Sequence, residues 1–356
     1  MTKEQWHIFK KRNLKIYARN KIFGVHRLKQ AMGREESNLA LSVSLKMARK
    51  FIQFLSCFLP FVAWRKAFRN YFMKFFQFSL VDVEYFKKMV AFKLFGKIVL
   101  PQVEFAVTTR CNLRCKHCTN YIPYLSNEAQ KVLDFKHFKM YLNHLLANVS
   151  RLNSLLLLGG EPLLNKELPQ MLEYSLNCAK IENVYLTTNG TIAFNDELKE
   201  LFCKHKNKLW VWISNYTANE KLVKRLKSFE LLDFCKANQI NYIFIENNIW
   251  GKSLAPKYYE RSDEENSSYF LKCNNPCVSV YGNELSVCPR ASHFSAMKMI
   301  TQWGGGEHLL LNQKISKANL ISFYTFTNFS ACRYCDVLSE NESVIPALQL
   351  DEGKNE

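Results

Sequence analysis

The sequence is short of acidic residues and of long apolar runs. It has 49 Lys and Arg against 31 Asp and Glu, a formal net charge of +18. Its strongly apolar stretch at residues 51–64 contains Pro60 and is flanked by basic residues. It is too short to span a bilayer, which takes about 20 residues. The first residues also lack the apolar core of a signal peptide. We therefore expect a cytoplasmic protein.

The positive charge is concentrated near the N-terminus. Residues 1–100 hold 21 Lys and Arg against 5 Asp and Glu, whereas the other 256 hold 28 against 26. Aromatic residues recur at helical spacing opposite cations in this region, namely Trp64, Phe68, Tyr71, Phe72 and Phe75. Such a helix lies in a membrane interface. We expect residues 1–100 to form a basic helical extension, peripheral at the inner face of the membrane.

Two alternatives to membrane binding stay open for this extension. The aromatic side chains could instead pack on the rest of the protein. A strongly basic segment also suits nucleic acid, which is the least favoured of the three partners.

Cysteine is plentiful, with 12 residues in a chain that is 48% hydrophobic. Without a signal peptide, this number favours metal ligation in a reducing compartment over disulfides. Four cysteines lie in helix-like runs and are expected to be small buried hydrophobes: Cys57, Cys178, Cys203 and Cys235. The other eight are candidate ligands.

From residue 101 strand-like and helix-like stretches alternate, which is typical of an α/β fold with a parallel sheet. Strands are expected at 103–108, 154–158, 184–188, 209–214 and 240–246. Helices are expected at 134–151, 168–180, 196–205 and 220–237. In such folds the active groups lie at the carboxyl ends of the strands.

Three cysteines follow the first expected strand. Cys111, Cys115 and Cys118 form a C-x3-C-x2-C pattern. Three thiolates can hold three corners of a [4Fe-4S] cluster, which normally takes four Cys, so one iron stays open to a small molecule. The alternative is a Zn site, which is usually closed by four ligands, completed here by His117 or a distant Cys.

A glycine-rich motif ends the second expected strand. Gly159-Gly160-Glu161-Pro162 follows four consecutive leucines, and an ordinary turn is its alternative interpretation. In this order, the cysteine triplet and the Gly-Gly-Glu-Pro motif resemble the radical S-adenosylmethionine (radical SAM) superfamily. The resemblance implies a partial (β/α)6 TIM-like barrel over residues 101–250.

The resemblance also implies a chemistry. In this superfamily the three-cysteine cluster binds SAM at its open iron and cleaves it reductively to a 5′-deoxyadenosyl radical, which abstracts hydrogen from the substrate. Cys111, Cys115 and Cys118 would be the ligands, and a flavodoxin or ferredoxin would supply electrons. The implied SAM-binding residues are Gly159, Gly160, Glu161, Pro162, Asn189, Ser214 and Asn215.

The residue types at these positions suit such roles. Glycines without a Cβ let the backbone approach a ligand, and Glu161 can accept hydrogen bonds from the SAM ammonium. Pro162 would fix the turn, and His117 would pack near the adenine without ligating iron. Asn189 and the Ser214–Asn215 pair have an alternative interpretation as helix N-caps.

Five further cysteines lie downstream: Cys273, Cys277, Cys288, Cys332 and Cys335. A β-hairpin is predicted around Gly282-Asn283. A hairpin between cysteines followed by C-x2-C resembles the twitch form of the SPASM extension, which implies an auxiliary [4Fe-4S] cluster held by four of the five. A Zn site is the alternative. The extension is expected at residues 251–345, with a polar tail at 346–356.

The favoured substrate is a sugar or lipid-linked intermediate of surface-polysaccharide biosynthesis, because the basic extension would place the enzyme where these are made. The apolar run and the following aromatic, basic stretch also resemble N-terminal segments of bacterial surface-polysaccharide enzymes. A peptide substrate comes second. The contrasting class is a non-catalytic, Zn-stabilised scaffold on a polyanionic surface. No catalytic residue can be named, and surface roles are expected for Glu246, Lys252, Arg290 and His293.

Overall fold

The computed structural model describes residues 95–350, apart from 245–248, 253–255, 274–277 and 339–341, together with a few residues between 54 and 68. They fall into two compact units, Tyr17–Lys97 and a unit that holds everything from Ile98 onward. Cys57, Cys277, Glu246 and most of the predicted interfacial helix lie outside the described residues. Among the helices described, none has the length and apolar character needed to cross a membrane.

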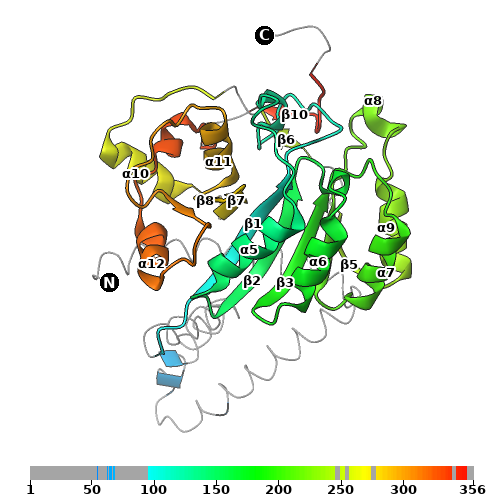
Figure 1. The fold of residues 1–356 in the computed structure, drawn as a ribbon, viewed down its shortest axis with the longest axis horizontal. Helices are drawn as coiled ribbons and strands as arrows, with labels where there is room; N and C mark the ends of the chain where they lie inside the picture. The colour runs from blue at the N-terminus through cyan, green and yellow to red at the C-terminus, as the bar shows by residue number, and fades with distance from the viewer. Residues whose placement is uncertain are drawn as a thin grey trace. The chain divides into compact units, whose positions relative to one another are not determined.

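An eight-stranded sheet organises the unit that holds the chain from Ile98 onward (Figure 1). Its strand order is β5-β4-β3-β2-β1-β7-β8-β9. The first six of these strands are parallel, β8 pairs antiparallel with β7, and β9 pairs antiparallel with β8. Their bounds are β1 Val99–Thr108, β2 Arg151–Gly159, β3 Ile181–Thr188, β4 Leu209–Ile213, β5 Asn241–Phe244, β7 Val278–Tyr281, β8 Glu284–Ser286 and β9 His308–Leu310. The predicted α/β fold with a parallel sheet is confirmed.

Strand β1 lies inside the sheet and is covered on both faces. Leu100, Val103, Phe105 and Val107 are all at most 1% exposed. A nearly continuous apolar run is typical of a central parallel strand, which has no solvent face. Because β1 is fixed by β2 on one side and β7 on the other, the cysteine loop that leaves its carboxyl end starts from a rigid point.

Helices connect the parallel strands: α5 Phe135–Leu146, α6 Leu168–Asn177, α7 Asp196–Lys204, α8 Glu220–Val223 and α9 Ser228–Ala237. Asp134 caps α5 by accepting from the His137 N–H at 2.8 Å. The ring of Phe138 in α5 packs on Phe105 of β1 at 5.2 Å. The helix predicted at 220–237 is two helices, because the Lys227 N–H donates to the carbonyl of Gly190 instead of continuing the helix.

Beyond β1 the sheet continues with β7, β8 and β9. The chain from residue 263 onward also forms a second set of helices: α10 Asp263–Lys272, α11 Pro289–Ala296, α12 Lys317–Thr325 and the 3-10 helix η3 Ser330–Tyr334. The predicted hairpin is present as β7–β8, with Gly282 at φ +58° in its turn. It belongs to the same sheet as the core strands. The short strands β6 (Trp250–Gly251) and β10 (Ser343–Val344) pair separately. Five strands alternating with helices precede them in the part described, so a six-unit barrel stays a prediction.

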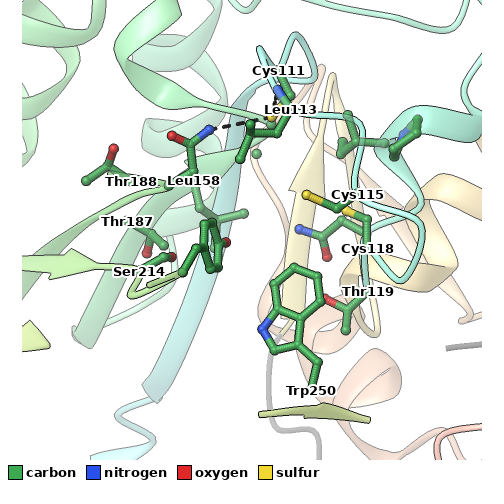
Figure 2. A pocket seen from close by; sticks show the side chains of 17 residues that line it. Cys111, Leu113, Cys115, Cys118, Thr119, Leu158, Thr187, Thr188, Ser214 and Trp250 are labelled. Atoms are coloured by element: carbon green, nitrogen blue, oxygen red, sulfur yellow. Dashed lines mark hydrogen bonds between the residues drawn. The ribbon is translucent and has the colours of Figure 1, made fainter. Parts of the chain in front are cut away.

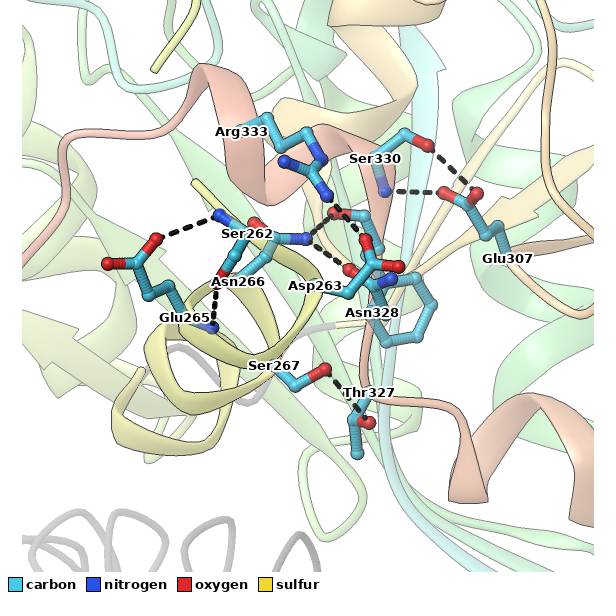
Figure 3. Close-up of polar contacts among 11 residues, drawn as sticks. Ser262, Asp263, Glu265, Asn266, Ser267, Glu307, Thr327, Asn328, Ser330 and Arg333 are labelled. Carbon is cyan, nitrogen blue, oxygen red and sulfur yellow. Dashed lines mark hydrogen bonds and ion pairs between the residues drawn. The ribbon is translucent and has the colours of Figure 1, made fainter. Parts of the chain in front are cut away.

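Polar contacts hold η3 against α10 (Figure 3). Ser262 and Glu265 form a capping box at the start of α10. The buried Asn266 amide donates to Asn328 Oδ1 at 2.8 Å and to the carbonyl of Phe329 at 2.9 Å. Glu307 accepts from the backbone and hydroxyl of Ser330. These contacts fix the segment that carries Cys332 and Cys335.

Candidate active site

The cysteine loop leaves β1 and returns to the same point. The Thr109 N–H donates to the carbonyl of Lys131 at 2.8 Å, and the Lys131 N–H donates to the Thr109 hydroxyl at 2.7 Å. Asn165 bridges the two arms by donating to the carbonyls of Val107 and Leu133, both at 2.9 Å. Cys111, Cys115 and Cys118 therefore stand on a loop that is closed at its base.

Gly159 and Gly160 let the end of β2 contact this loop. A Cβ on Gly159, whose φ is +146°, would lie 1.9 Å from the carbonyl oxygen of Thr108. One on Gly160 would lie 2.2 Å from that of Arg110. In return, the Gly160 N–H donates to Thr108 and the Glu161 N–H to Arg110. The glycines are thus required by backbone packing, in addition to any approach to a ligand.

A pocket opens at the carboxyl ends of β1 to β4 (Figure 2). In the view of Figure 2, Cys115 and Cys118 lie across the space from Thr187, Thr188 and Ser214. Its other lining residues include Cys111, Leu158, Gly159, Gly160, Asn189, Tyr216 and Trp250. Three thiols, two glycine backbones and several hydroxyl and amide groups therefore surround one cavity.

Each of the three sulfur atoms has N–H groups close to it. Cys111 Sγ accepts from the Leu113 N–H at 3.4 Å and from Asn189 Nδ2 at 3.7 Å. Cys115 Sγ accepts from Gln349 Nε2 at 3.5 Å, and backbone N–H groups at residues 120–122 approach Cys118. Burial raises the pKa of the Cys111 thiol to about 11 and that of Cys115 to about 12. Metal binding would displace these protons.

The donor set suits an iron-sulfur cluster. Soft thiolates with N–H donors beside them are the ligands such clusters take, and the pocket leaves space beside the sulfurs for a further ligand. Among the residues that the structure describes, no group of three or more His, Cys, Asp or Glu side chains is arranged to hold a single metal ion. The fit therefore rests on the chemistry of the donors and on the pocket they share.

Glu161 is built into the strand ends. Its side chain is 0% exposed and accepts from the Asn189 N–H at 2.7 Å, the Thr188 hydroxyl at 3.0 Å and the Leu163 N–H at 3.1 Å. Burial raises its pKa to about 7. With its oxygen atoms used in this way, Glu161 joins β2 to β3 and orients Asn189, which lines the pocket.

The other predicted SAM-binding residues divide into two sets. Asn189 and Ser214 line the pocket with both glycines. Asn189 is held by its Nδ2 donating to Asn112 Oδ1 at 2.9 Å. Pro162 begins the 3-10 helix η2 (Pro162–Leu164) and is buried. Asn215 is 7% exposed and accepts hydrogen bonds from the backbone N–H and the hydroxyl of Thr217 in a local turn. Neither Pro162 nor Asn215 is among the residues that line the pocket.

The downstream cysteines also come together. Burial raises the pKa of the Cys332 thiol well above its ordinary value, and the nearby Cys288, Cys335 and Cys273 raise it further. Cys288 caps α11 by accepting from the Ala291 N–H at 3.4 Å. All ten cysteines that the structure describes are free thiols. Four thiols from separate segments thus share one region.

Arg290 lies beside this second group. A surface role was predicted for it, but its side chain is buried. It is 7% exposed and donates from Nη1 to Asp336 Oδ1 at 2.5 Å and to Cys335 Sγ at 3.6 Å. Its guanidinium lies 5.4 Å from the ring of Tyr121 in the cysteine loop, and its charge acts on Cys118. Arg290 therefore stands between the two cysteine groups.

Comparison with known proteins agrees with this geometry. The model of the radical SAM superfamily matches residues 105–231, which run from β1 into α9 and include the cysteine loop and the Gly-Gly-Glu-Pro motif. Residues 105–231 form a radical SAM superfamily domain. The three thiols lie within this domain, and so do the residues that line the pocket, apart from Trp250.

Curated relatives match this chain over short stretches. GTP 3′,8-cyclase of Syntrophomonas wolfei subsp. wolfei is 30% identical over 99 residues, covering 27% of this chain and 30% of the relative. Fe-coproporphyrin III synthase of Methanosarcina barkeri is 32% identical over 107 residues, 30% of this chain and 25% of the relative. Both relatives are named as enzymes. This chain thus spans about a third or less of these relatives.

A solved structure, SuiB of Streptococcus suis, overlaps more of the chain at lower similarity. It covers 83% of this chain and 69% of SuiB, at 16% identity and a TM-score of 0.31.

Several residues of the site were not predicted from the sequence. Tyr216 and Trp250 line the pocket with their rings 5.6 Å apart, and Gln349 reaches Cys115 from 234 positions away. Ala347, near the start of the polar tail predicted at 346–356, is instead 0% exposed and packs with Leu113 and Cys115. His293 was predicted to lie at the surface but is 1% exposed. Cys203 was predicted to be buried but is exposed. Cys235 is buried as predicted.

Proposed function

We propose that the chain is a radical SAM enzyme whose cluster is held by Cys111, Cys115 and Cys118. The observation that carries the proposal is the meeting of these three thiols with the Gly159–Gly160 backbone in one pocket of the radical SAM domain. When bound, the cluster and SAM supply reductive cleavage of SAM and hydrogen abstraction. The chain's own residues hold the sulfurs, donate N–H groups to them and shape the cavity.

The pocket residues have distinct tasks in this proposal. Asn189 stands between Cys111, Asn112 and the Glu161 carboxylate, so it ties the cysteine loop to β3. Ser214 and Thr187 offer hydroxyls across from Cys115 and Cys118. Tyr216 and Trp250 supply an apolar wall, which would exclude water from the reacting groups.

The test is reconstitution without oxygen. Wild-type protein should bind iron and sulfide and release 5′-deoxyadenosine from SAM in a dithionite-dependent reaction. Cys115→Ala should lose this activity, whereas Cys203→Ala, a matched change at an exposed cysteine, should retain it. Tightly bound zinc with no SAM cleavage would contradict the proposal and favour the Zn-stabilised scaffold.

We further propose that the second cysteine group holds an auxiliary [4Fe-4S] cluster. Its support is the mutual proximity of Cys273, Cys288, Cys332 and Cys335, four thiols as such a cluster needs. About eight irons per chain are expected in the wild type and about four in Cys332→Ala. An unchanged iron content in Cys332→Ala would contradict a ligand role for this residue.

The substrate is proposed from the basic extension and from the relatives. A nucleotide- or lipid-linked sugar remains favoured, with a peptide as the alternative, and the relatives named GTP 3′,8-cyclase make GTP a third candidate. Stimulation of 5′-deoxyadenosine release by each class would discriminate them. Stimulation by GTP alone would overturn the sugar proposal.

We also propose that the N-terminal unit associates with a membrane surface. Phe54, Val62 and Trp64 are 60%, 76% and 58% exposed, as expected of a face that enters an interface. Full-length protein should sediment with anionic liposomes at low salt, and protein lacking residues 1–78 should not. Equal sedimentation of the two proteins would contradict the proposal.

A further inference from the structure

A segment from the end of the described chain covers the cysteine loop. We call residues 342–350 the cover segment. It starts at β10, where Val344 pairs with Trp250 of β6. Asn219 Nδ2 then donates to the carbonyl of Ala347 at 2.9 Å. Ala347 packs in one cluster with Tyr216, and Trp250 packs against that cluster. The cover segment therefore supports two residues that line the pocket.

The cover segment pairs with the cysteine loop itself. The Lys116 N–H donates to the carbonyl of Leu348 at 2.6 Å, and the Leu350 N–H donates to that of Arg114 at 2.7 Å. Cys115 and Gln349 face each other in this antiparallel bridge. Cys115 is only 7% exposed. The middle cysteine of the triplet is therefore shielded by a segment outside the radical SAM domain.

The side chain of Gln349 has one defined orientation. Its Oε1 accepts from the Arg114 N–H at 2.8 Å, which places the amide nitrogen on the other side. The nitrogen donates to the carbonyl of Ala347 at 2.6 Å and to Cys115 Sγ at 3.5 Å. The backbone N–H of Arg114 can only donate, and the backbone carbonyl of Ala347 can only accept. Reversing the side-chain amide of Gln349 would therefore lose both hydrogen bonds.

We propose that Gln349 is a positioning residue that donates a hydrogen bond to the Cys115 sulfur and thereby raises the electron affinity of the cluster held by Cys111, Cys115 and Cys118. The inference rests on the proposed function, since it assumes that Cys115 ligates iron. Hydrogen bonds to cluster sulfurs are among the factors that set reduction potentials. A donor stabilises the more negative, reduced state and so makes reduction easier.

The test is an EPR-monitored redox titration of the reconstituted full chain. Gln349→Met keeps the length of the side chain and removes the donor. At a fixed solution potential, the ratio of reduced to oxidised cluster should fall about tenfold, a shift of ~59 mV for one electron. Gln349→Glu keeps an oxygen for the Arg114 N–H but offers no N–H to sulfur, so its shift should have the same sign. It decides the question if the Met variant does not fold.

A matched control separates the hydrogen bond from the anchoring of the cover segment. Asn219→Ala removes the contact to Ala347 and leaves Gln349 intact, so its potential should equal that of the wild type. A wild-type potential in both Gln349 variants would overturn the inference, as would an equal shift in Asn219→Ala. Absence of any cluster signal in the wild type would instead refute the proposed function, so the two failures are distinguishable.

Discussion

The two cysteine groups are assembled in different ways. Cys111, Cys115 and Cys118 come from one loop closed at its base and line an open pocket. The second group is collected from separate segments after α10, at the start of α11 and around η3. Local sequence therefore sets the first group, whereas the second exists only when the fold beyond β7 is complete.

The groups also differ in what surrounds the sulfurs. Neutral amides donate to Cys111 and Cys115, whereas the guanidinium of Arg290 donates to Cys335. Charge-assisted hydrogen bonds are roughly twice as strong as neutral ones. If both groups hold clusters, we expect the second to be reduced at the more positive potential.

Removing Arg290 should have the largest effect on stability. Arg290→Met takes away the guanidinium that neutralises Asp336, a residue only 3% exposed. Breaking a buried pair costs about 3–5 kcal/mol, to be measured by urea denaturation of the metal-free protein. Arg333→Met is the control, because its partner Asp263 is 79% exposed and such pairs contribute about 0–1 kcal/mol. An equal loss of unfolding free energy in both variants would show that the buried pair of Arg290 and Asp336 contributes no more to stability than the exposed one.

The matching change in the first group is Gly160→Ala. Its Cβ would meet the carbonyl of Arg110 at 2.2 Å, so the cysteine loop must move away from β2. We expect a loss of about 3 kcal/mol and poor iron retention after reconstitution. Gly305→Ala, which has no atom within 4 Å of its Cβ, should change neither. Full iron retention in Gly160→Ala would show that the loop tolerates the displacement.

Glu161 gives the first group a pH dependence. Its pKa is raised by burial from 4.5 to about 7, so between these values the folded state holds a proton that the unfolded chain has lost. Stability should therefore fall as pH rises through this window, by up to about 3 kcal/mol. Glu161→Gln should remove that fall in denaturation curves of the metal-free protein. Parallel curves for the two proteins would contradict the raised pKa.

The smallest effect on stability is expected at the start of the cover segment, where Glu342 pairs with Lys252. Lys252 Nζ lies 2.9 Å from Glu342 Oε2, with side chains 41% and 78% exposed. Lys252→Ala should cost less than about 1 kcal/mol, because the Lys252 N–H still donates to the carbonyl of Glu342 at 2.8 Å. Thermal denaturation checks this. A larger loss would mean that charge, and not backbone pairing, holds the cover segment.

Much of the fold and of the first group was predictable because both depend on short-range patterns. Apolar runs such as 155–158 identify buried strands, and the spacing of Cys111, Cys115 and Cys118 places three thiols on one loop. The hairpin at Gly282-Asn283 is equally local, since its turn needs positive φ.

The rest depends on long-range contacts that leave no local pattern. Arg290 follows Cys288-Pro289 as an ordinary basic residue, and only the fold brings Asp336 to it. Gln349 reads as part of a polar tail until residues 114–116 are seen to pair with it. The glycine motif was predicted to let the backbone approach a ligand closely. The close approach that the structure shows is to the backbone carbonyls of Thr108 and Arg110.

The central place of β1 also has a consequence for how the chain folds. Val103 in β1 pairs with Val278 in β7, so one edge of this apolar strand stays open until a much later part of the chain has been made. Such distant pairing slows folding, and an open apolar edge invites association between chains. A fragment that ends before residue 278 should therefore aggregate on expression, even though it contains the whole radical SAM domain.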